Sequence, residues 1–339
     1  MRRTPPPAAL AVVLAVAVTT LQFLLLPLFA GPAAHMEPRD LPVVVAGPAP
    51  AVAAFTAKIE SASPGAFEVT TVADAAAADA AVLDREAYAA FILSPTGVTL
   101  HTATAAAPPV ANLFSAAATQ LGAATGMPVT VADLAPLSAD DAHGGGFAAG
   151  FFPLVITALL AAIALYFAVP GFAARVVGLF TFAGLAGVSG ASVLQSWLGV
   201  VGGDWLPVAG VIALITLAVS ATVHGLASVA GPRGIALGVA LILLVGNALG
   251  AVGAAPELLP QPWGEVGQWL PIGAGATLLR SAAWFGGAGG GAAAWVLASW
   301  ALLGLALVGV GWLGRKEQAA PDDDQAHEAA RRLGATVAA

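Results

Sequence analysis

Long apolar runs separated by short polar breaks make up most of this chain. The runs occupy residues 8–29, 147–169, 176–200, 206–229, 235–252 and 292–314. Each is long enough to cross the roughly 30 Å hydrocarbon core of a bilayer as a helix. The first run exceeds the usual signal-peptide core of about 7–15 residues, so we expect it to be a retained helix. The pattern predicts an α-helical polytopic membrane protein with six transmembrane helices.

The pattern changes between the first two runs, over residues 31–146. Short β-type stretches alternate there with helical stretches, in the order strand–helix–strand–helix–strand–strand–helix–strand. This order predicts a small α/β domain with a mixed sheet. Asp74 precedes one helical stretch as an N-cap. The apolar spacing predicts inward-facing residues in the first and last helices: Val52, Phe55 and Ile59, and then Val110, Leu113, Phe114 and Leu121.

The distribution of basic residues predicts the orientation in the membrane. With six helices, Arg2 and Arg3, Arg175, Arg233, and Arg315 with Lys316 all fall on one side. Basic loops favour the cytoplasmic side. We therefore expect a multi-pass protein of the plasma membrane with both termini cytoplasmic. Residues 31–146 are then extracellular, and 315–339 form a polar cytoplasmic tail.

Composition supports a membrane protein and excludes several other classes. The chain is 59% hydrophobic and 9% charged, whereas soluble domains are about a quarter charged. It has no cysteine, which excludes disulfides and thiolate metal sites. The net charge of −7 comes from local clusters and gives no reason to expect a nucleic-acid partner.

A stretch rich in proline, glycine and tryptophan, residues 253–291, interrupts the apolar pattern before the last run. It is too broken to span the bilayer and too apolar for a solvated loop. Tryptophan is typical of the membrane–water interface, and irregular backbone at membrane depth survives only beside protein or a water-filled cavity. We predict an outer re-entrant or interfacial segment that acts as a mouth or gate. Within it, residues 274–285 suit an amphipathic interfacial helix.

The charged residues of this segment have several possible roles. Arg280 is expected to snorkel to the headgroups, to hold lipid phosphates, or to pair with an acid of the α/β domain. Glu257 and Glu265 are expected on the outer face, either hydrated or at the entrance of a substrate path.

Polar residues inside the apolar runs are few. Such residues usually face the interior of the bundle, and here they serve either interhelical hydrogen bonds or a pathway. His224 precedes the Arg233 loop and is expected near the cytoplasmic surface. The others are Gln22, Ser189, Ser192, Gln195, Ser196, Thr216, Ser220 and Asn247.

The sequence lacks the usual signatures of catalysis. There is no G-x-x-x-x-G-K-[ST] phosphate loop and no H-E-x-x-H zinc motif. Asp140, Asp141 and His143 are interpreted as a solvated hinge in preference to a metal site. We expect no cofactor and no enzymatic activity of the chain itself.

Three motifs carry a family resemblance: DREAYAAFILSP at 84–95, GNALG at 246–250, and APELLPQPWGEVGQWLPIGAGATLLR at 255–280. With the layout, they resemble ABC-2 type transporter permeases, and more closely the actinobacterial phage-infection-protein-like (Pip/YhgE-like) membrane proteins. The resemblance implies that the Pro/Gly-rich segment lies beside the exit path. The candidate gate residues are Asn247, Pro260, Pro262, Trp263, Gly264, Pro271, Gly273, Gly275 and Arg280.

The resemblance implies a permease subunit that exports a hydrophobic or amphipathic substrate. Its expected partners are the lipid bilayer, a second permease subunit in a homo- or heterodimer, and a separate ATP-binding subunit. Arg175 and Arg233 are the candidate coupling residues, although their loops are very short for an ATPase interface. The alternative is a non-transporting membrane scaffold whose extracellular domain binds a cell-envelope component or a protein.

Overall fold

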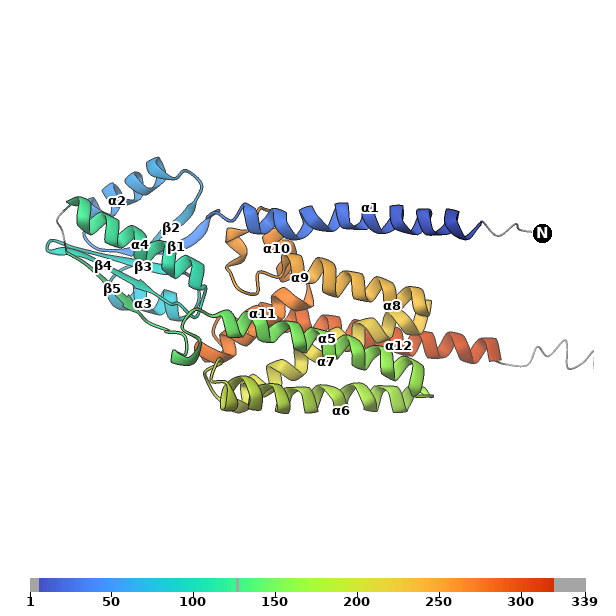
Figure 1. Cartoon of the computed structure of the whole chain (residues 1–339). Coiled ribbons are helices and arrows are strands. Elements are labelled where there is room, and N and C mark those ends of the chain that lie inside the picture. Colours follow the sequence, from blue (N-terminus) through green and yellow to red (C-terminus); the bar gives the residue numbers. More distant parts are fainter. Residues whose placement is uncertain (1–5, 126–127, 320–339) are drawn as a thin grey trace, which may run out of the picture.

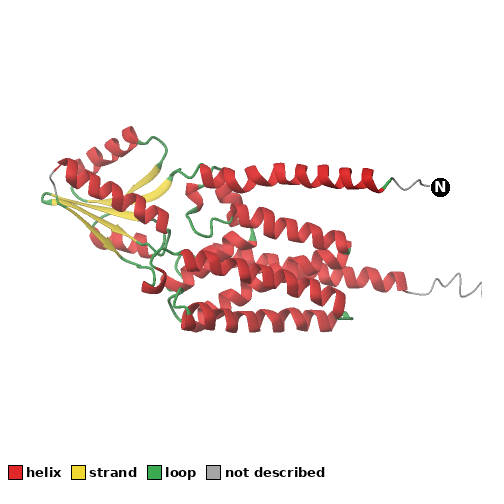
Figure 2. Cartoon of the chain, viewed as in Figure 1, coloured by secondary structure: helices red, strands yellow, loops and turns green. Residues whose placement is uncertain are grey.

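The computed structural model describes residues 6–125 and 128–319 as a helical bundle with a small sheet domain at one end (Figures 1 and 2). In this described part, six helical segments are long and apolar enough to cross a membrane, which confirms the prediction. They are α1 (Pro7–Ala34), α5 (Gly145–Ala168), α6 (Phe172–Ala191) with a π-helical turn to Trp197, α7 (Trp205–Ala230), α8 (Pro232–Val239) continuing through a π-helical stretch into α9 (Asn247–Leu249), and α12 (Gly291–Ala319).

Helix α12 runs past residue 314, where the last apolar run was expected to end. Most of the predicted tail, residues 320–339, lies outside the described residues, as do Arg2 and Arg3.

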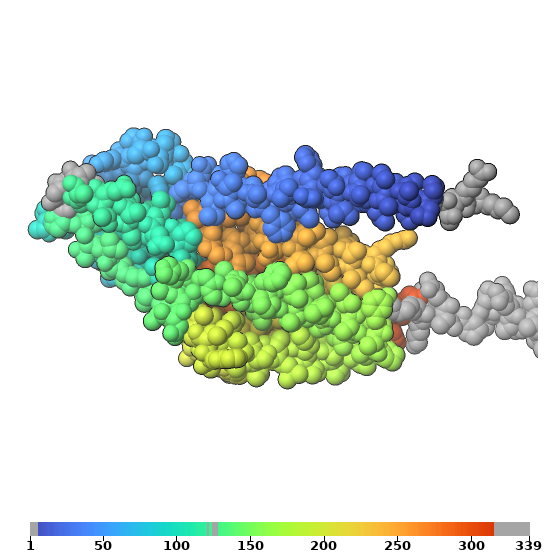
Figure 3. All heavy atoms as spheres, viewed as in Figure 1, coloured from blue at the N-terminus to red at the C-terminus, as the bar shows by residue number. Residues whose placement is uncertain are grey.

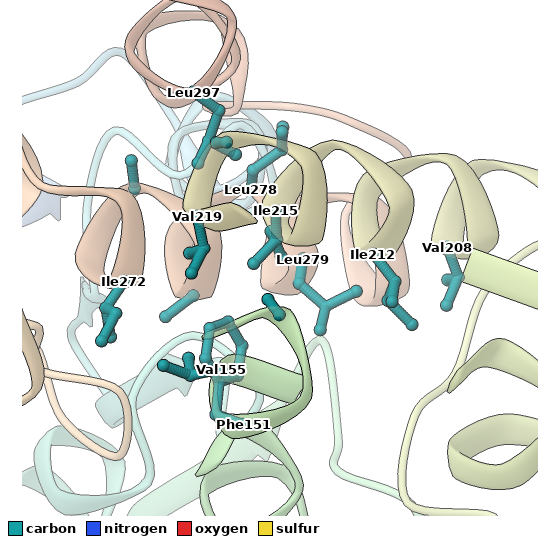
Figure 4. Packing of buried hydrophobic residues seen from close by; sticks show 14 of the residues in the cluster. Phe151, Val155, Val208, Ile212, Ile215, Val219, Ile272, Leu278, Leu279 and Leu297 are labelled. Carbon is teal, nitrogen blue, oxygen red and sulfur yellow. The ribbon is translucent and has the colours of Figure 1, made fainter. Parts of the chain in front are cut away.

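Helix α7 is the centre of the bundle. Val208, Ile212, Ile215 and Val219 recur every three or four residues and are fully buried. Figure 4 shows these side chains between α5, represented by Phe151 and Val155, and the helix α11 (Pro271–Trp284). A spacing of three or four residues places side chains on one helical face, so one continuous apolar stripe joins α7 to its neighbours.

Helix α1 stands apart from the bundle. None of its residues is buried, and Figure 3 shows it (blue) along one edge of the molecule. The residues that follow α1 form backbone hydrogen bonds with the outer segment. The amide of Glu37 donates to the oxygen of Leu258 at 3.0 Å, and that of Arg39 to the oxygen of Glu257 at 3.1 Å. The start of the sheet domain is therefore bonded directly to the outer segment.

The sheet domain has the predicted order of elements. Its strands lie in the order β2-β1-β3-β4-β5, with β3 and β4 antiparallel and the other pairs parallel, so the sheet is mixed. Asp74 caps α3 as expected, its Oδ1 accepting from the amide of Ala77 at 2.9 Å. The elements are β1 (Leu41–Ala46), α2 (Ala49–Ala62), β2 (Phe67–Thr71), α3 (Ala75–Leu83), β3 (Ala89–Ser94), β4 (Gly97–Thr102), α4 (Pro108–Thr125) and β5 (Val129–Asp133).

One inward-facing residue of this domain was predicted wrongly. Val110 and Phe114 of α4 are buried as expected, but Leu113 is exposed because it turns away from the face that carries the other two. The side chain of Leu121 lies outside the described residues.

The core of the sheet domain includes residues from the outer segment. Ala254, Ala255 and Leu258 pack with Leu41 and Val43 on one face of the sheet. Phe285 packs with Val44 and Ala46 on the opposite face. Successive strand residues point to opposite faces, so the outer segment contributes to both. The domain predicted at 31–146 is completed by residues more than a hundred positions away.

The outer segment contains no helix of membrane-spanning length within its described residues, as its broken pattern predicts. It consists of a short 3₁₀ turn at Pro256–Leu258, α10 (Trp263–Gln268) and α11. The expectation of an interfacial amphipathic helix is wrong. Most of α11 is buried against α7 and α12, because small residues and aliphatic side chains occupy its whole circumference.

Candidate functional site

A cavity of about 980 Å³ lies where the sheet domain, the outer segment and α12 meet. We call it the outer vestibule. Its deep part contains Arg85, Tyr88, Glu257 and Arg280. Exposed acids, namely Asp40, Glu68 and Glu265, lie on its rim.

Arg85 is positioned by the way α3 ends. The amide of Glu86 donates to the oxygen of Ala81 at 2.9 Å, and that of Arg85 to the oxygen of Val82 at 3.2 Å. This is the Schellman arrangement, in which the residue at Arg85 is usually glycine because φ is positive. Here φ is 63°, a conformation that costs a residue with a Cβ roughly 1–2 kcal/mol. The guanidinium group donates to the oxygen of Thr277 in α11 at 2.9 Å.

Tyr88 and Glu257 join the sheet domain to the outer segment. The hydroxyl of Tyr88 donates to Oε2 of Glu257 at 2.8 Å. Burial raises the pKa of the Tyr88 phenol well above its usual value, and the negative charge of Glu257 raises it further. The pKa of Arg85 is lowered, chiefly by burial, while Tyr88 and Glu257 oppose the shift. The protonated phenol is the form that donates this hydrogen bond.

Arg280 does not snorkel to a headgroup layer. Its side chain is 5% exposed, its Nη2 donates to the oxygen of Val252 at 2.7 Å, and its guanidinium lies 4.9 Å from the ring centre of Phe147. Burial lowers its pKa to about 10, with a contribution from the positive charge of Arg85. It is therefore charged at neutral pH. In the described residues no carboxylate lies within 4.0 Å of either Arg85 or Arg280.

One wall of the vestibule is the outer part of α12. Trp295, Ser299 and Leu303 line it at intervals of four residues, and Trp295 is 75% exposed. The indole of Trp300 donates to the oxygen of Trp269 at 2.7 Å, which ties α12 to the end of α10. Because α12 has the length and hydropathy of a membrane span, the vestibule continues onto an apolar, membrane-length surface.

The predicted gate glycines are packing positions. A Cβ on Gly264 would lie 2.1 Å from the oxygen of Pro256, and one on Gly273 would lie 2.3 Å from the oxygen of Gly267. Gly275 is less restricted, with the side chain of Ile215 at 3.0 Å. These glycines let the turns of the outer segment approach one another more closely than any side chain permits.

The other predicted gate residues lie at different places. Pro271 begins α11 and is buried. Pro260 and Trp263 line a second cavity, of about 560 Å³, beneath the end of α1, and the exposed Pro262 precedes α10. Asn247 is exposed and does not face the bundle interior. Only Arg280 of the predicted gate residues lines the outer vestibule.

The residues predicted on the cytoplasmic side, Arg175, Arg233 and His224, differ in burial and in hydrogen-bond partners. Arg175 Nε donates to the oxygen of Val169 at 2.8 Å and its Nη2 to that of Tyr166 at 2.9 Å. Arg175 thus satisfies carbonyls at the end of α5. Arg233 is exposed. His224 lies near the end of α7 that precedes the Arg233 turn, and its side chain is fully buried in the bundle, with Nδ1 3.0 Å from the oxygen of Ala162 in α5.

The hinge at Asp140, Asp141 and His143 has a helix-capping role. Both carboxylate oxygens of Asp141 accept at 2.9 Å, from the amides of Gly146 and Phe147 at the start of α5. A carboxylate there also complements the helix dipole. Among the described residues, no three His, Cys, Asp or Glu side chains are grouped closely enough to hold a metal ion.

Sequence reasoning did not identify Arg85 and Tyr88 as site residues. Arg85 is one of few basic residues in the domain, and Tyr88 is one of two tyrosines in the chain. Both lie in the motif at 84–95, and this position is the feature of the sequence that could have marked them as candidate site residues. No protein-family model matches this chain, and searches of the curated proteins and of the solved structures find no match either. The family resemblance therefore stays a prediction.

Proposed function

We propose that the chain is a membrane-spanning permease subunit of an ABC-2 type exporter. It moves a hydrophobic or amphipathic substrate outward across the plasma membrane, and the outer vestibule is the exit. The sheet domain is extracellular and both termini are cytoplasmic.

The outer vestibule carries this proposal. It combines two charged groups, the half-buried Arg85 and the buried Arg280, with the exposed indole of Trp295 on a membrane-length helix. Ligand sites are concave and mostly apolar, with a few convergent polar groups. A cavity of about 980 Å³ that opens both toward the sheet domain and along an apolar helix suits a substrate that passes between bilayer and solvent.

The placement of charge supports the orientation. Arg175 and Arg233 lie at the turns between α5 and α6 and between α7 and α8, at the end of the bundle away from the sheet (Figure 1). Basic residues favour the cytoplasmic side. The sheet domain and the vestibule are then outside.

A dimer is part of the proposal. Helix α1 has no buried residue, although it is long and apolar enough to span a membrane. In the membrane, close packing of helices through small residues favours association. A second permease subunit, identical or related, covers this helix.

The ATPase is a separate subunit, and the structure offers it little surface. Only residues 169–171 join α5 to α6, and only Gly231 joins α7 to α8. These short turns favour the alternative, a non-transporting scaffold whose sheet domain binds a cell-envelope component or a protein.

The decisive experiment purifies the full chain from its own cells in mild detergent and identifies co-purifying ATPases. A Walker-A subunit that co-purifies, and is lost when the exposed Arg233 is changed to Glu, supports the exporter. The matched control is Lys58→Glu, an equal charge reversal on the sheet domain that leaves co-purification unchanged. The exporter proposal is contradicted, and the scaffold favoured, if no ATPase co-purifies and cells that lack the chain move fluorescent lipids outward as fast as cells that have it.

A further inference from the structure

The deep part of the outer vestibule has an excess of positive charge. Arg85 and Arg280 contribute two positive charges and Glu257 contributes one negative charge. The third lining arginine, Arg39, is paired with Glu37 at 2.6 Å. The remaining acids, Asp40 and Glu265 among them, lie exposed at the rim, where water screens their charge. One positive charge in the deep part thus lacks a counterion among the described residues.

Each of the two arginines uses only part of its hydrogen-bonding capacity. A guanidinium group has five N–H donors. The hydrogen bonds of Arg85 and Arg280 in the structure go to the backbone oxygens of Thr277 and Val252 respectively. Neither bond neutralises a charge. No nitrogen of either guanidinium is among the enclosed, unsatisfied side-chain atoms of the described residues, and both side chains line the vestibule.

The two guanidinium groups reach the cavity from different elements, Arg85 from the end of α3 and Arg280 from α11. Arg85 is fixed by the end of α3 and lies over the ring of Phe285 at 5.4 Å, whereas Arg280 is fixed in α11 over Phe147. Arginine in this state favours oxyanions, because its planar donors match the oxygens of phosphate and carboxylate. Arg85 is half-buried and Arg280 is buried. Fixing two charges of like sign near one another, with limited access to water, is unfavourable unless an anion lies between or beside them.

The wall beyond the arginines is apolar. Trp295 and Leu303 on α12 and Trp269 at the end of α10 line it, and Trp269 is 71% exposed. Because α12 is long and apolar enough to span a membrane, this wall suits a hydrocarbon chain. The polar and apolar parts adjoin within one cavity, so a single ligand contacts both.

We propose that the outer vestibule binds an amphiphile whose headgroup carries one negative charge, with the anion at Arg85 and Arg280 and the hydrocarbon chain along the α12 wall. The statement that this amphiphile is the exported substrate rests on the proposed function. The binding site itself stands independently of transport. A membrane lipid with a phosphodiester headgroup has this chemistry, and so does a fatty acid.

The test measures binding to the purified full chain in a neutral maltoside detergent, with no ATPase present. The probe is phosphatidylglycerol with a fluorescent NBD group, followed by polarisation. Unlabelled phosphatidylglycerol, glycerophosphoglycerol and diacylglycerol compete as whole ligand, headgroup alone and chains alone. We expect phosphatidylglycerol to compete at least about tenfold better than either fragment. Equal competition by glycerophosphoglycerol or by diacylglycerol overturns the proposal.

Variants locate the site. Arg85→Gln and Arg280→Gln are each expected to weaken probe binding about tenfold or more, while Arg85→Lys keeps the charge but not the planar donors and recovers only part of the affinity. Arg233→Gln removes the same charge at the far end of the bundle and leaves binding unchanged. Thermal unfolding of each variant verifies that it is folded. If Arg280→Gln fails to fold, Arg85→Gln decides alone, and unchanged affinity in that variant contradicts the proposed site.

The outcomes separate this inference from the exporter proposal. If probe binding depends on Arg85 but no ATPase associates with the chain, the binding site is supported and the exporter proposal is wrong. If an ATPase associates but phosphatidylglycerol does not bind, the exporter proposal is supported and its substrate is not an anionic amphiphile.

Discussion

At the scale of single residues, the link between the sheet domain and the outer segment depends on the protonation of Tyr88. Its hydroxyl donates to Glu257, and its pKa is raised by burial and by that carboxylate. An unfolded tyrosine has a pKa of about 10. The folded state therefore favours the neutral phenol. The resulting stability is complete below pH ~10 and is lost as the pH rises toward the folded pKa.

Tyr88→Phe tests this coupling. At pH 7 the variant is expected to lose about 1.5–3 kcal/mol, the contribution of a hydrogen bond to a charged group. Between pH ~9 and ~11 the parent protein is expected to lose more stability than the variant, because only the parent has a phenol at residue 88. Thermal unfolding in detergent at a series of pH values measures both. Parallel loss of stability in the two proteins contradicts the assignment.

The glycines of the outer segment determine how closely its turns pack. In Gly273→Ala the new Cβ lies 2.3 Å from the backbone oxygen of Gly267, so we expect a loss of about 1–3 kcal/mol from overpacking. Gly275→Ala meets only the side chain of Ile215 and is expected to cost less. Gly210→Ala is the control, because nothing lies within 4 Å of its Cβ. The unfolding temperatures should follow this order, and a Gly273 variant as stable as the control refutes the close contact.

At the scale of secondary-structure elements, the sheet domain and the outer segment fold as one unit. Leu258 lies in the same apolar cluster as Leu41 and Phe114, although it is far away in the sequence. Deleting a buried leucine side chain to alanine costs about 2–5 kcal/mol. Leu258→Ala is therefore expected to destabilise the sheet domain itself.

Limited proteolysis of the full chain measures this effect. Cleavage within residues 41–133 should accelerate in the Leu258 variant. Leu113→Ala is the matched control, since this leucine is exposed on α4 and its loss should change stability by about 0.5 kcal/mol or less. Equal protection of both variants shows that the domain folds without the outer segment.

The sequence predicts the elements well because their signals are local. Alternation of apolar residues, the Asp74 cap and the proline and glycine breaks were enough to give the order of the sheet domain. The vestibule depends on contacts that no local pattern encodes, such as Tyr88 with Glu257 and Arg85 with Thr277. An arginine among small residues has the same pattern at a membrane surface and in a buried helix, which is why the sequence left the surroundings of Arg280 open.

At the scale of the whole molecule, the outer vestibule is proposed to be the extracellular exit. Transport therefore depends on free space between α12 and the sheet domain. Ser299 is exposed within this space. The chain contains no cysteine, so an introduced cysteine is the one thiol of this chain that a maleimide can modify. Ser61, exposed on α2 of the sheet domain and absent from the vestibule lining, is the matched control position.

The most direct measurement follows outward movement of NBD-labelled phosphatidylglycerol in intact cells that carry Ser299→Cys or Ser61→Cys, before and after a bulky membrane-impermeant maleimide. We expect both cysteines to be labelled from outside. Labelling at residue 299 should reduce outward movement to the level of cells without the chain, and labelling at residue 61 should leave it unchanged. Outward movement that persists after complete labelling at residue 299, or that never depends on the chain, contradicts the account.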